Sequence, residues 1–414
     1  MPKNKNLFFQ ILQNLCRKDK LFLEIPNGES FSYNQMISIS SQYANALTDF
    51  GVKENERVIL QTEKVVQSIW LYLACLRIGA IFIPLNPAYT AAETIFFIQD
   101  ADPSLFVYGK NPPEREIQCL LDNKGIEMVR LNGVEKSCLE TLASKYSPTF
   151  KTCESNETSV AAILYTSGTT GRSKGAMITH KNLLSNAKAL TSIWKFSSND
   201  VLLHILPIYH THGLFVALNT VLFSNSSILF LDKFRVKETA NQLEKATVLM
   251  GVPTHYVRLL KEKILTKKLV SNMRLFISGS APLSPRIHKQ FYKATGHKIL
   301  ERYGMTETNM ITSNPYDADR RAGHLFRHRS SGRQRLPRRL SCGLHAEGLP
   351  PPPDRPDRGF QRGLPVAVPD GAVPDARPAG DTERAAQGFL AGDCLRRSAH
   401  ADRPPAGRVR QREL

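Results

Sequence analysis

From about residue 20 to residue 310, short apolar segments alternate with longer stretches of helical periodicity. Apolar runs such as RVILQT, AIFIPL, SILFL and RLFISGS have the length of strands. In HKNLLSNAKALTSIW, the residues Leu183, Leu184, Ala187 and Leu190 share one face of a helix. Strands that alternate with helices predict an α/β fold with largely parallel sheets. Many predicted strands end in Gly, Ser, Thr or Pro, and α/β enzymes bind ligands at such strand ends.

The most apolar stretch, VVQSIWLYLACLRIGAIFIPL, is predicted to be a buried helix followed by a buried strand. It contains Gln67 and Arg77 and breaks at Gly79, which argues against a membrane span. The whole chain has 42% hydrophobic and 22% charged residues, as expected of a globular protein. Its net charge of +18 raises nucleic acid or an anionic membrane as a partner. An enzyme with anionic substrates explains the same charge, so we expect no nucleic-acid partner and no membrane span.

Seven cysteines are scattered along the chain without C-x-x-C spacing. Their odd number and their spacing predict reduced thiols in a cytosol-like compartment, rather than a disulfide framework or a zinc site. The N-terminal segment lacks a signal-peptide core, so the expected location is cytoplasmic. These features indicate no particular oligomeric state. The cysteines are Cys16, Cys75, Cys119, Cys138, Cys153, Cys342 and Cys394.

The segment ILYTSGTTGRSKGAMITH, Ile163–His180, carries the strongest chemical signal. A predicted strand ends at Tyr165, and a loop rich in Gly, Ser and Thr follows. Its glycines let backbone N–H groups converge on an anion without obstruction by a Cβ atom. Hydroxyl groups and a lysine complete a loop suited to nucleotide phosphates, although Ser173 distinguishes it from the GxxxxGK[ST] loop. The residues of this predicted phosphate loop are Thr166, Ser167, Gly168, Thr169, Thr170, Gly171 and Lys174.

Three motifs in the same order resemble those of the adenylate-forming superfamily, which includes acyl-CoA synthetases, other AMP-dependent ligases and luciferases. YTSGTTGRSKG resembles its phosphate loop, RYGMTET (Arg302–Thr308) its second nucleotide motif, and LPIYHTHG (Leu206–Gly213) its substrate-side motif. The resemblance covers roughly residues 5–323. Within the superfamily, PIYHTHGLFVALN, ATVLMGVPT, RLFISGSAPL and ERYGMTETNMITSNPYD are most similar to malonyl-CoA synthetases. These enzymes join malonate or methylmalonate to CoA.

The resemblance implies the large N-terminal domain of an adenylate-forming enzyme and a two-step ligation linked to fatty acid metabolism. The acid first forms an acyl-adenylate with release of pyrophosphate, and the CoA thiol then displaces AMP. ATP, Mg²⁺ and the co-substrate CoA are therefore expected. By resemblance, Thr306 contacts phosphate and Glu307 holds Mg²⁺ as a hard oxygen ligand. Glu307 as a solvated loop carboxylate is the alternative.

The resemblance also assigns residues to an adenine site. Gly279–Leu283 and Glu301–Gly304 would form its walls, with Tyr303 stacking on the base. Ordinary core packing is the alternative for Tyr303. Outside the phosphate loop, the implied nucleotide-binding residues are Gly279, Ser280, Ala281, Glu301, Arg302, Tyr303 and Gly304; the implied catalytic residues are His210, Thr306 and Glu307.

The acid site is expected around the substrate-side motif. By resemblance, His210 lies at the junction of the acyl group and the phosphate. The second carboxylate of malonate stays ionised, and its burial requires a cation. Arg286 stands where similar malonyl-CoA synthetases carry a pocket arginine, although a surface role is the alternative; Thr211 and Met310 are expected to line the pocket. The second histidine of HTH, His212, is expected to be structural rather than a metal ligand.

After Gly323 the composition changes. Residues 324–414 contain no Lys, Ile, Met, Asn, Tyr or Trp, but 12 of the 25 prolines and 17 arginines. Such a segment buries too little apolar surface to offset chain entropy, which predicts disorder. We expect an AMP-binding domain over 1–323, incomplete at its C-terminal end, and an Arg/Pro-rich tail over 324–414. The superfamily instead continues with a domain that carries a catalytic lysine, so we expect full ligase activity to be impaired.

The tail also suggests an out-of-frame origin. RSSGRQR, at 329–335, can be encoded so that reading one nucleotide later yields Ala-Leu-Pro-Gly-Val-Ser-Val. That peptide is similar to a loop expected shortly after RRAG in malonyl-CoA synthetases. We hypothesise a frameshift or an equivalent sequence error near residue 324, which the nucleotide sequence around codon 323 would decide.

Three other interpretations remain open. A medium-chain or aryl acid–CoA ligase would keep the fold and change the acid. A non-catalytic nucleotide-binding remnant or a basic-tail interaction protein would show salt-sensitive nucleic-acid binding that depends on 324–414. A pseudogene product would be poorly soluble.

Overall fold

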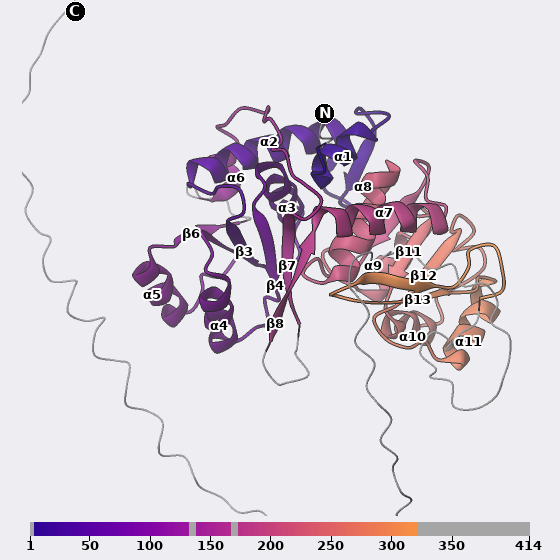
Figure 1. The fold of residues 1–414 in the computed structure, drawn as a ribbon. Helices are drawn as coiled ribbons and strands as arrows, with labels where there is room; N and C mark the ends of the chain where they lie inside the picture. The colour runs from indigo at the N-terminus through magenta and orange to yellow at the C-terminus, as the bar shows by residue number, and fades with distance from the viewer. Residues whose placement is uncertain (1–3, 132–137, 167–172, 321–414) are drawn as a thin grey trace, which may run out of the picture. The chain divides into compact units, whose positions relative to one another are not determined.

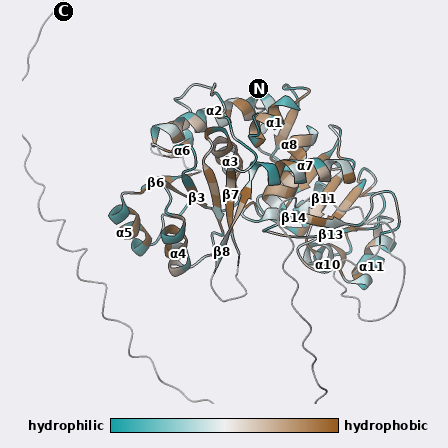
Figure 2. Ribbon diagram, viewed as in Figure 1, coloured by the Kyte–Doolittle hydropathy of each residue, from teal (hydrophilic) through white to brown (hydrophobic). Residues whose placement is uncertain are grey.

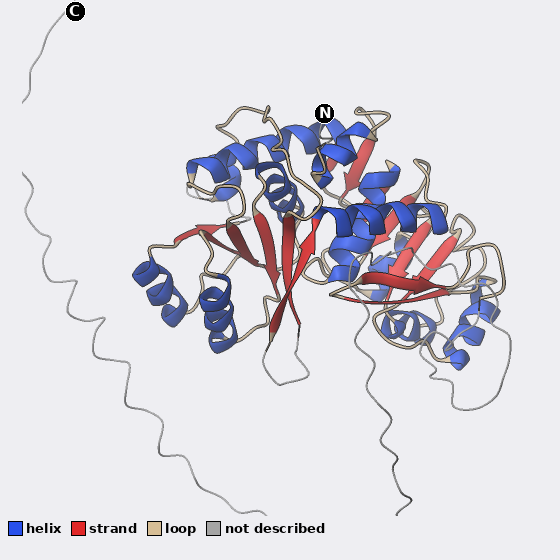
Figure 3. Cartoon of the chain, in the orientation of Figure 1, coloured by secondary structure: helices blue, strands red, loops and turns tan. Residues whose placement is uncertain are grey.

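The computed structural model describes residues 4–131, 138–166 and 173–320. Among them, the strands form two sheets (Figures 1 and 3). The predictions of a disordered tail and of a frameshift fall outside the described residues, as do Cys342 and Cys394. Cys16, Cys75 and Cys153 carry free thiols.

The first sheet has six strands, and each neighbouring pair is parallel except the last, which is an antiparallel hairpin. The predicted phosphate loop begins in the first strand of this hairpin, at Thr166, and ends in the second, at Lys174. In spatial order the strands are β6 (Glu127–Arg130), β5 (Leu105–Tyr108), β3 (Arg57–Gln61), β4 (Ile81–Leu85), β7 (Val160–Thr166) and β8 (Lys174–Thr179).

The second sheet has eight strands and is parallel through its centre, with an antiparallel pair at each edge. These two sheets confirm the predicted α/β fold with largely parallel pairing. In spatial order the strands are β14 (Asn309–Ser313), β13 (Leu300–Met305), β12 (Leu275–Ser278), β11 (Val248–Gly251), β9 (Val201–His204), β10 (Ser227–Phe230), β1 (Leu21–Glu24) and β2 (Ser30–Ser32).

Helices cover the sheets, and Figure 2 shows hydrophobic residues gathered on the central strands. Twelve helical segments lie within the described residues. They are α1 (Leu7–Gln13), α2 (Tyr33–Asp49), α3 (Gln67–Ile78), α4 (Ala91–Ala101), α5 (Arg115–Lys124), α6 (Leu139–Ala143), α7 (His180–Ile193), the π-helix η1 (His212–Leu218), α8 (Asn219–Ser224), α9 (Val236–Asn241), α10 (Pro253–Lys261) and α11 (Pro285–Thr295).

The most apolar stretch of the sequence forms α3 and β4, as predicted. Nearly every residue of α3 is buried, and all five residues of β4 are buried. Gly79 ends the helix in the left-handed region, at φ 77°, where glycine is strongly favoured. No helix of the described residues has both the length and the apolar character needed to cross a membrane.

Helix α7 connects the hairpin of the first sheet to the edge of the second. Its predicted apolar face is confirmed, because Leu183, Ala187 and Leu190 are buried and Leu184 packs against the same core. On the second sheet, the Asn186 amide donates to the Met310 carbonyl at 3.1 Å. Trp194, just after the helix, donates from Nε1 to Ser313 Oγ at 3.0 Å. The helix thereby fixes β14 and the turn that precedes it.

A buried ion pair lies at the starting ends of the central strands of the second sheet. Asp200, 3% exposed, precedes β9 and binds Arg274, which precedes β12. Nε of Arg274 lies 2.6 Å from Asp200 Oδ1, and Nη2 lies 2.8 Å from Oδ2. Thr247, just before β11, donates to Asp200 Oδ1 at 2.9 Å. Three parallel strands are thus held in line where they begin.

Replacing Arg274 with Met should lower the free energy of unfolding by about 3–5 kcal/mol, because it leaves the Asp200 carboxylate buried without its cation. Arg235→Met is the matched control. Arg235 also binds an aspartate, Asp232, through two hydrogen bonds, and it binds Glu238 through a third, but these side chains are 40–54% exposed, so the loss should be much smaller. Urea titrations of both variants measure the difference. Similar losses in both would contradict this ranking.

The pH dependence of this contribution has a defined sign. Burial acts to raise the pKa of Asp200, but Arg274, the Ser197 amide and Thr247 outweigh burial and hold the pKa below its usual value. The stabilisation is therefore fully present above about pH 4, the ordinary aspartate pKa, and is lost as pH falls through the lower native pKa. Arg274→Met should weaken this acid-side loss.

Candidate nucleotide and acid site

The carboxyl ends of β9, β11, β12 and β13 lie at one edge of the second sheet. Their parallel register pairs Met250 with His204, Gly251 with Ser278, and Ser278 with Glu301. The segments that follow these strand ends are therefore neighbours, although they are far apart in sequence. They include the substrate-side motif and both predicted walls of the adenine site.

Arg302 in β13 is a deeply buried cation at this edge. It is 1% exposed, and its Nε and Nη2 atoms have no hydrogen-bond partner among the described residues. Burial lowers the pKa of Arg302 to about 9, which still leaves the guanidinium charged at neutral pH. Its planar group packs against Gly279, where a Cβ atom would overlap with Cζ and Nε and lie 2.6 Å from Nη1. A cation with unpaired N–H groups is costly to bury, and this one is suited to an anion.

His212 of the substrate-side motif contacts the segment Gly279–Leu283, which is one of the two predicted walls of the adenine site. Its Nδ1 atom lies 3.3 Å from Oγ of Ser280, a residue held at φ 68°. Burial, followed by the charge of Arg302, lowers the pKa of His212 well below its usual value, so the ring is neutral. Its Nε2 atom and Oγ1 of the adjacent Thr211 are buried and unpaired among the described residues. Like Nε and Nη2 of Arg302, these two atoms have no hydrogen-bond partner in the part of the chain that the structure describes.

The two nucleotide motifs meet across the two sheets. Oγ1 of Thr166, at the end of β7, donates to Oε1 of Glu307 at 3.2 Å. Glu307 lies in the turn between β13 and β14 and is exposed, as is Lys174, which pairs with Thr166 in the β7–β8 hairpin. Thr306, beside Glu307, is half-buried. Five residues of the predicted phosphate loop fall outside the described residues: Ser167, Gly168, Thr169, Thr170 and Gly171.

The walls of the predicted adenine site have different structural environments. Glu301 is fully buried, and its carboxylate accepts from the Leu283 amide at 2.8 Å, which holds the segment from Gly279 to Leu283 against β13. Ala281 is exposed, and Tyr303 and Gly304 are half-buried. A Cβ atom at Gly304 would overlap with the Asn309 carbonyl, so only glycine fits this hairpin. The nucleotide roles of these residues stay predictions.

The acid-site candidates are not all brought together. His210 is exposed beside the Tyr209 ring, and partial enclosure lowers its pKa. Met310 is buried in the main core cluster. Arg286 is exposed in the first turn of α11, whereas Arg302, which the motif placed in the nucleotide wall, is the cation buried beside Gly279. Sequence alone carries no signal for this difference, because both arginines lie in or beside recognised motifs.

Metal ligands are sparse at this edge. No group of three or more His, Cys, Asp or Glu in the described ranges could hold a metal ion. The Glu307 carboxylate and the Thr166 hydroxyl do offer hard oxygen donors. Mg²⁺ fits such a site, since it usually takes one or two carboxylates and completes its shell with phosphate and water.

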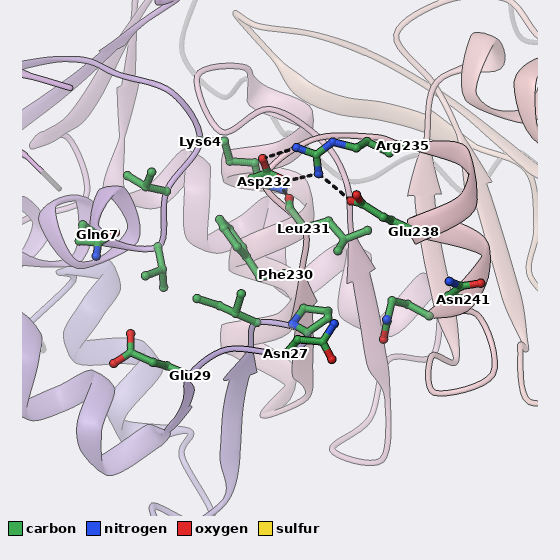
Figure 4. A pocket seen from close by; sticks show the side chains of 15 residues that line it. Asn27, Glu29, Lys64, Gln67, Phe230, Leu231, Asp232, Arg235, Glu238 and Asn241 are labelled. Atoms are coloured by element: carbon green, nitrogen blue, oxygen red, sulfur yellow. Dashed lines mark hydrogen bonds and ion pairs between the residues drawn. The ribbon is translucent and has the colours of Figure 1, made fainter. Parts of the chain in front are cut away.

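A pocket of about 600 Å³ lies away from these residues (Figure 4). The β1–β2 turn, the loop after β3, and the segment from β10 to α9 form its walls. It contains none of the predicted site residues, but Lys64 lies in its lining. Lys64 was not singled out in the sequence because it stands between ordinary polar and apolar residues.

Residues 13–333 match the family described as AMP-binding enzyme. A malonate–CoA ligase of Arabidopsis thaliana is 31% identical over 354 aligned positions, covering 76% of this chain and 57% of that protein. The chain spans about half the length of the curated relatives it matches.

Solved structures agree with the fold. ATP-bound MatB from Rhodopseudomonas palustris is 47% identical with a TM-score of 0.74, covering 77% of this chain and 63% of that one. A malonyl-CoA ligase in a ternary product complex with methylmalonyl-CoA and AMP is 29% identical with a TM-score of 0.62, covering 76% and 64%. The described residues therefore have the architecture of an adenylate-forming N-terminal domain.

Replacing Gly279 with Ala should lower the free energy of unfolding by about 1–3 kcal/mol, because the new Cβ atom overlaps with the enclosed Arg302 guanidinium. In an Arg302→Ala background the same replacement should cost clearly less. Urea titrations of the wild type, both single variants and the double variant form a thermodynamic cycle. An equal cost in both backgrounds would show that the overlap is not the cause.

Proposed function

The chain belongs to the AMP-binding enzyme family, and from that premise we propose that it is an ATP-dependent acid–CoA ligase whose acid is malonate or methylmalonate. The buried Arg302 guanidinium carries the proposal. A monocarboxylic acid would present an apolar tail to this cation, whereas a dicarboxylic acid brings a second carboxylate to pair with it. The names of the malonate-specific relatives point to the same acids.

Arg302 has the surroundings that an incoming carboxylate needs. Two of its nitrogens have no hydrogen-bond partner in the described part of the chain, and guanidinium–carboxylate pairs form two parallel hydrogen bonds. The neutral His212 ring lies close enough for the charge of Arg302 to help lower the pKa of that histidine. If the Ser280 hydroxyl donates to Nδ1, the His212 proton is on Nε2 and available to the same anion. In this arrangement one carboxylate is held while the other stays free to react.

The proposed reaction has two steps. A carboxylate oxygen of the acid attacks the α-phosphorus of ATP, and the bond to pyrophosphate breaks, giving an acyl-adenylate. The CoA thiol loses its proton and attacks the acyl carbon, and the bond to AMP breaks, giving the thioester. We propose that His210, exposed after β9, faces the reacting carboxylate in the first step. Such a thioester would enter fatty acid metabolism.

The Thr166–Glu307 contact is the proposed phosphate end of the site. It lies at the base of the phosphate loop, and Glu307 supplies the carboxylate that Mg²⁺ prefers. When bound, Mg²⁺ would neutralise phosphate charge. Thr166 orients the Glu307 carboxylate through its hydroxyl, and Lys174 adds a positive charge at the opposite side of the hairpin.

We propose that the described residues bind ATP and the acid. Direct binding measurements test the site without relying on turnover.

Arg302→Met should raise the Kd of malonate by about 10- to 100-fold, as expected for losing a charge-assisted hydrogen bond. Titration calorimetry with saturating α,β-methylene-ATP prevents adenylation during the measurement. Propionate, which has a methyl group in place of the second carboxylate, should lose no affinity. Arg286→Ala is the companion variant and should leave malonate binding within about twofold.

The two arginines give opposite outcomes if their roles are reversed. Malonate binding that depends on Arg286 and not on Arg302 would restore the sequence-based assignment. Equal losses for malonate and propionate in Arg302→Met would contradict a dicarboxylate site. A wild type that prefers octanoate or benzoate would favour the medium-chain or aryl acid alternative.

Glu307→Gln should weaken binding of the same ATP analogue about tenfold in the presence of Mg²⁺, equivalent to about 1.4 kcal/mol. The amide keeps the shape of the side chain and removes its charge. Without Mg²⁺, in EDTA, the variant and the wild type should bind the analogue alike. A loss of the same size in EDTA would show that Glu307 acts on the nucleotide by another route.

A further inference from the structure

Lys64 belongs to the loop after β3 of the first sheet, yet its amino group contacts the second sheet. It is 7% exposed, and Nζ lies 2.9 Å from His204 Nδ1, 2.8 Å from the His204 carbonyl oxygen and 2.6 Å from the Leu231 carbonyl oxygen. Nζ also lies 4.4 Å from the centroid of the Phe230 ring. Lys64 therefore links the ends of β9 and β10 to the other sheet.

These contacts differ from an ordinary ion pair. The nearby Asp232 carboxylate is directed to Arg235, at 3.0 and 2.9 Å, as Figure 4 shows. Lys64 is instead surrounded by three neutral acceptors. An ammonium group has three N–H bonds, so the number of acceptors matches the number of donors.

His204 continues the contacts toward the candidate acid site. Its ring is buried, and Nε2 lies 2.9 Å from the Gly213 carbonyl oxygen. A carbonyl oxygen only accepts, so Nε2 carries a proton. Nδ1 then accepts from Lys64, or Nδ1 is protonated as well and donates to a neutral Lys64 amine.

The proton is better placed on Lys64. Burial, and next the Lys64 charge, lower the pKa of His204 to about 3. Burial also lowers the pKa of Lys64 well below its usual value, while the charge of Asp232 opposes this. The two backbone carbonyls that accept from Nζ favour the ammonium form.

Gly213 belongs to a tightly packed segment. A Cβ atom at this position would overlap with the Pro207 carbonyl oxygen, and the Leu214 amide donates to the His210 carbonyl at 3.0 Å. The π-helix η1 begins at His212, and π-helical turns are frequent at functional sites. The hydrogen bond from His204 thus reaches the backbone that carries His210, Thr211 and His212.

We infer that Lys64 and His204 are positioning residues: through the Gly213 carbonyl they hold Leu206–Gly213 in the conformation that receives the acid. The chain of hydrogen bonds runs from the loop after β3, through His204, to the segment with the acid-site candidates. Neither residue contacts the acid itself. The identity of the acid rests on the proposed function. The hydrogen bonds from Lys64 to His204 and from His204 to Gly213 do not depend on which acid is bound.

Lys64→Met is the test variant, since it keeps most of the length of the side chain and removes the three donors. Lys20→Met is its matched control, because Lys20 also donates to backbone carbonyls, those of Ser198 and Asn225, but does not contact His204. With the ATP analogue bound, Lys64→Met should raise the Kd of malonate about 5- to 10-fold. Its Kd for the analogue alone should stay within about twofold, and Lys20→Met should change neither constant.

A spectroscopic measurement reads the hydrogen-bond chain directly and needs no activity. In ¹⁵N-histidine-labelled wild-type protein, His204 should show a protonated Nε2 and an unprotonated Nδ1, with the signal assigned by His204→Asn. In Lys64→Met this signal should shift, and in Lys20→Met it should not. This measurement keeps the inference testable if Lys64→Met folds poorly.

The outcomes separate the two proposals. A protonated Nδ1 with a bare Nε2 in the wild type would overturn the inference, whatever the ligand. A shifted His204 signal in Lys64→Met with unchanged malonate affinity would overturn the positioning role and leave the proposed function intact. A wild type that binds the nucleotide but not malonate would overturn the proposed acid and the role of Lys64 in receiving it, while the His204 signal would still report on the hydrogen-bond chain.

Discussion

The parallel pairing of β9, β11, β12 and β13 is the constraint on which the candidate site depends. Parallel strands begin at one edge of a sheet and end at the other, so distant segments meet where the strands end. Asp200, Arg274 and Thr247 hold three of these strands in line at their starting ends. The opposite edge brings the substrate-side motif beside Gly279 and Arg302. The ion pair and the candidate site therefore lie at opposite edges of the same parallel strands.

Two buried cations near this edge show how hydrogen bonding distinguishes a structural charge from a ligand-binding one. Lys64 has an acceptor for each of its three N–H bonds, which fits a role in holding the backbone. Arg302 has two nitrogens without a partner among the described residues, which fits a role in binding an anion. Both lie deep in the protein, and burial opposes the charge of both. The difference is visible only when the acceptors around each group are known.

Much of the fold was predictable because the sequence signals were local. The buried helix and strand around Gly79, the apolar face of α7 and the parallel α/β architecture follow from hydrophobic periodicity, which reports directly on burial. The site was predictable only in part. The contact between Thr166 and Glu307 joins two motifs that the sequence had already associated with one nucleotide. The assignments of Arg286 to the acid pocket and of Arg302 to the nucleotide wall stay predictions. The burial of Arg302, on which the proposed acid site rests, is not something that neighbouring motifs report.

The sequence by itself indicated the family, the order of the motifs and the class of chemistry that we propose, because glycine-rich phosphate loops and strand patterns are encoded by adjacent residues. Only the tertiary structure decided that Arg302 is a buried cation with two nitrogens unpaired within the described ranges. It also decided that Lys64 and His204 connect one sheet to the acid-site segment of the other. The physical reason is that burial and hydrogen-bond saturation depend on atoms brought together from distant parts of the chain. Lys64 and Gly213 meet through His204 only after both sheets have formed.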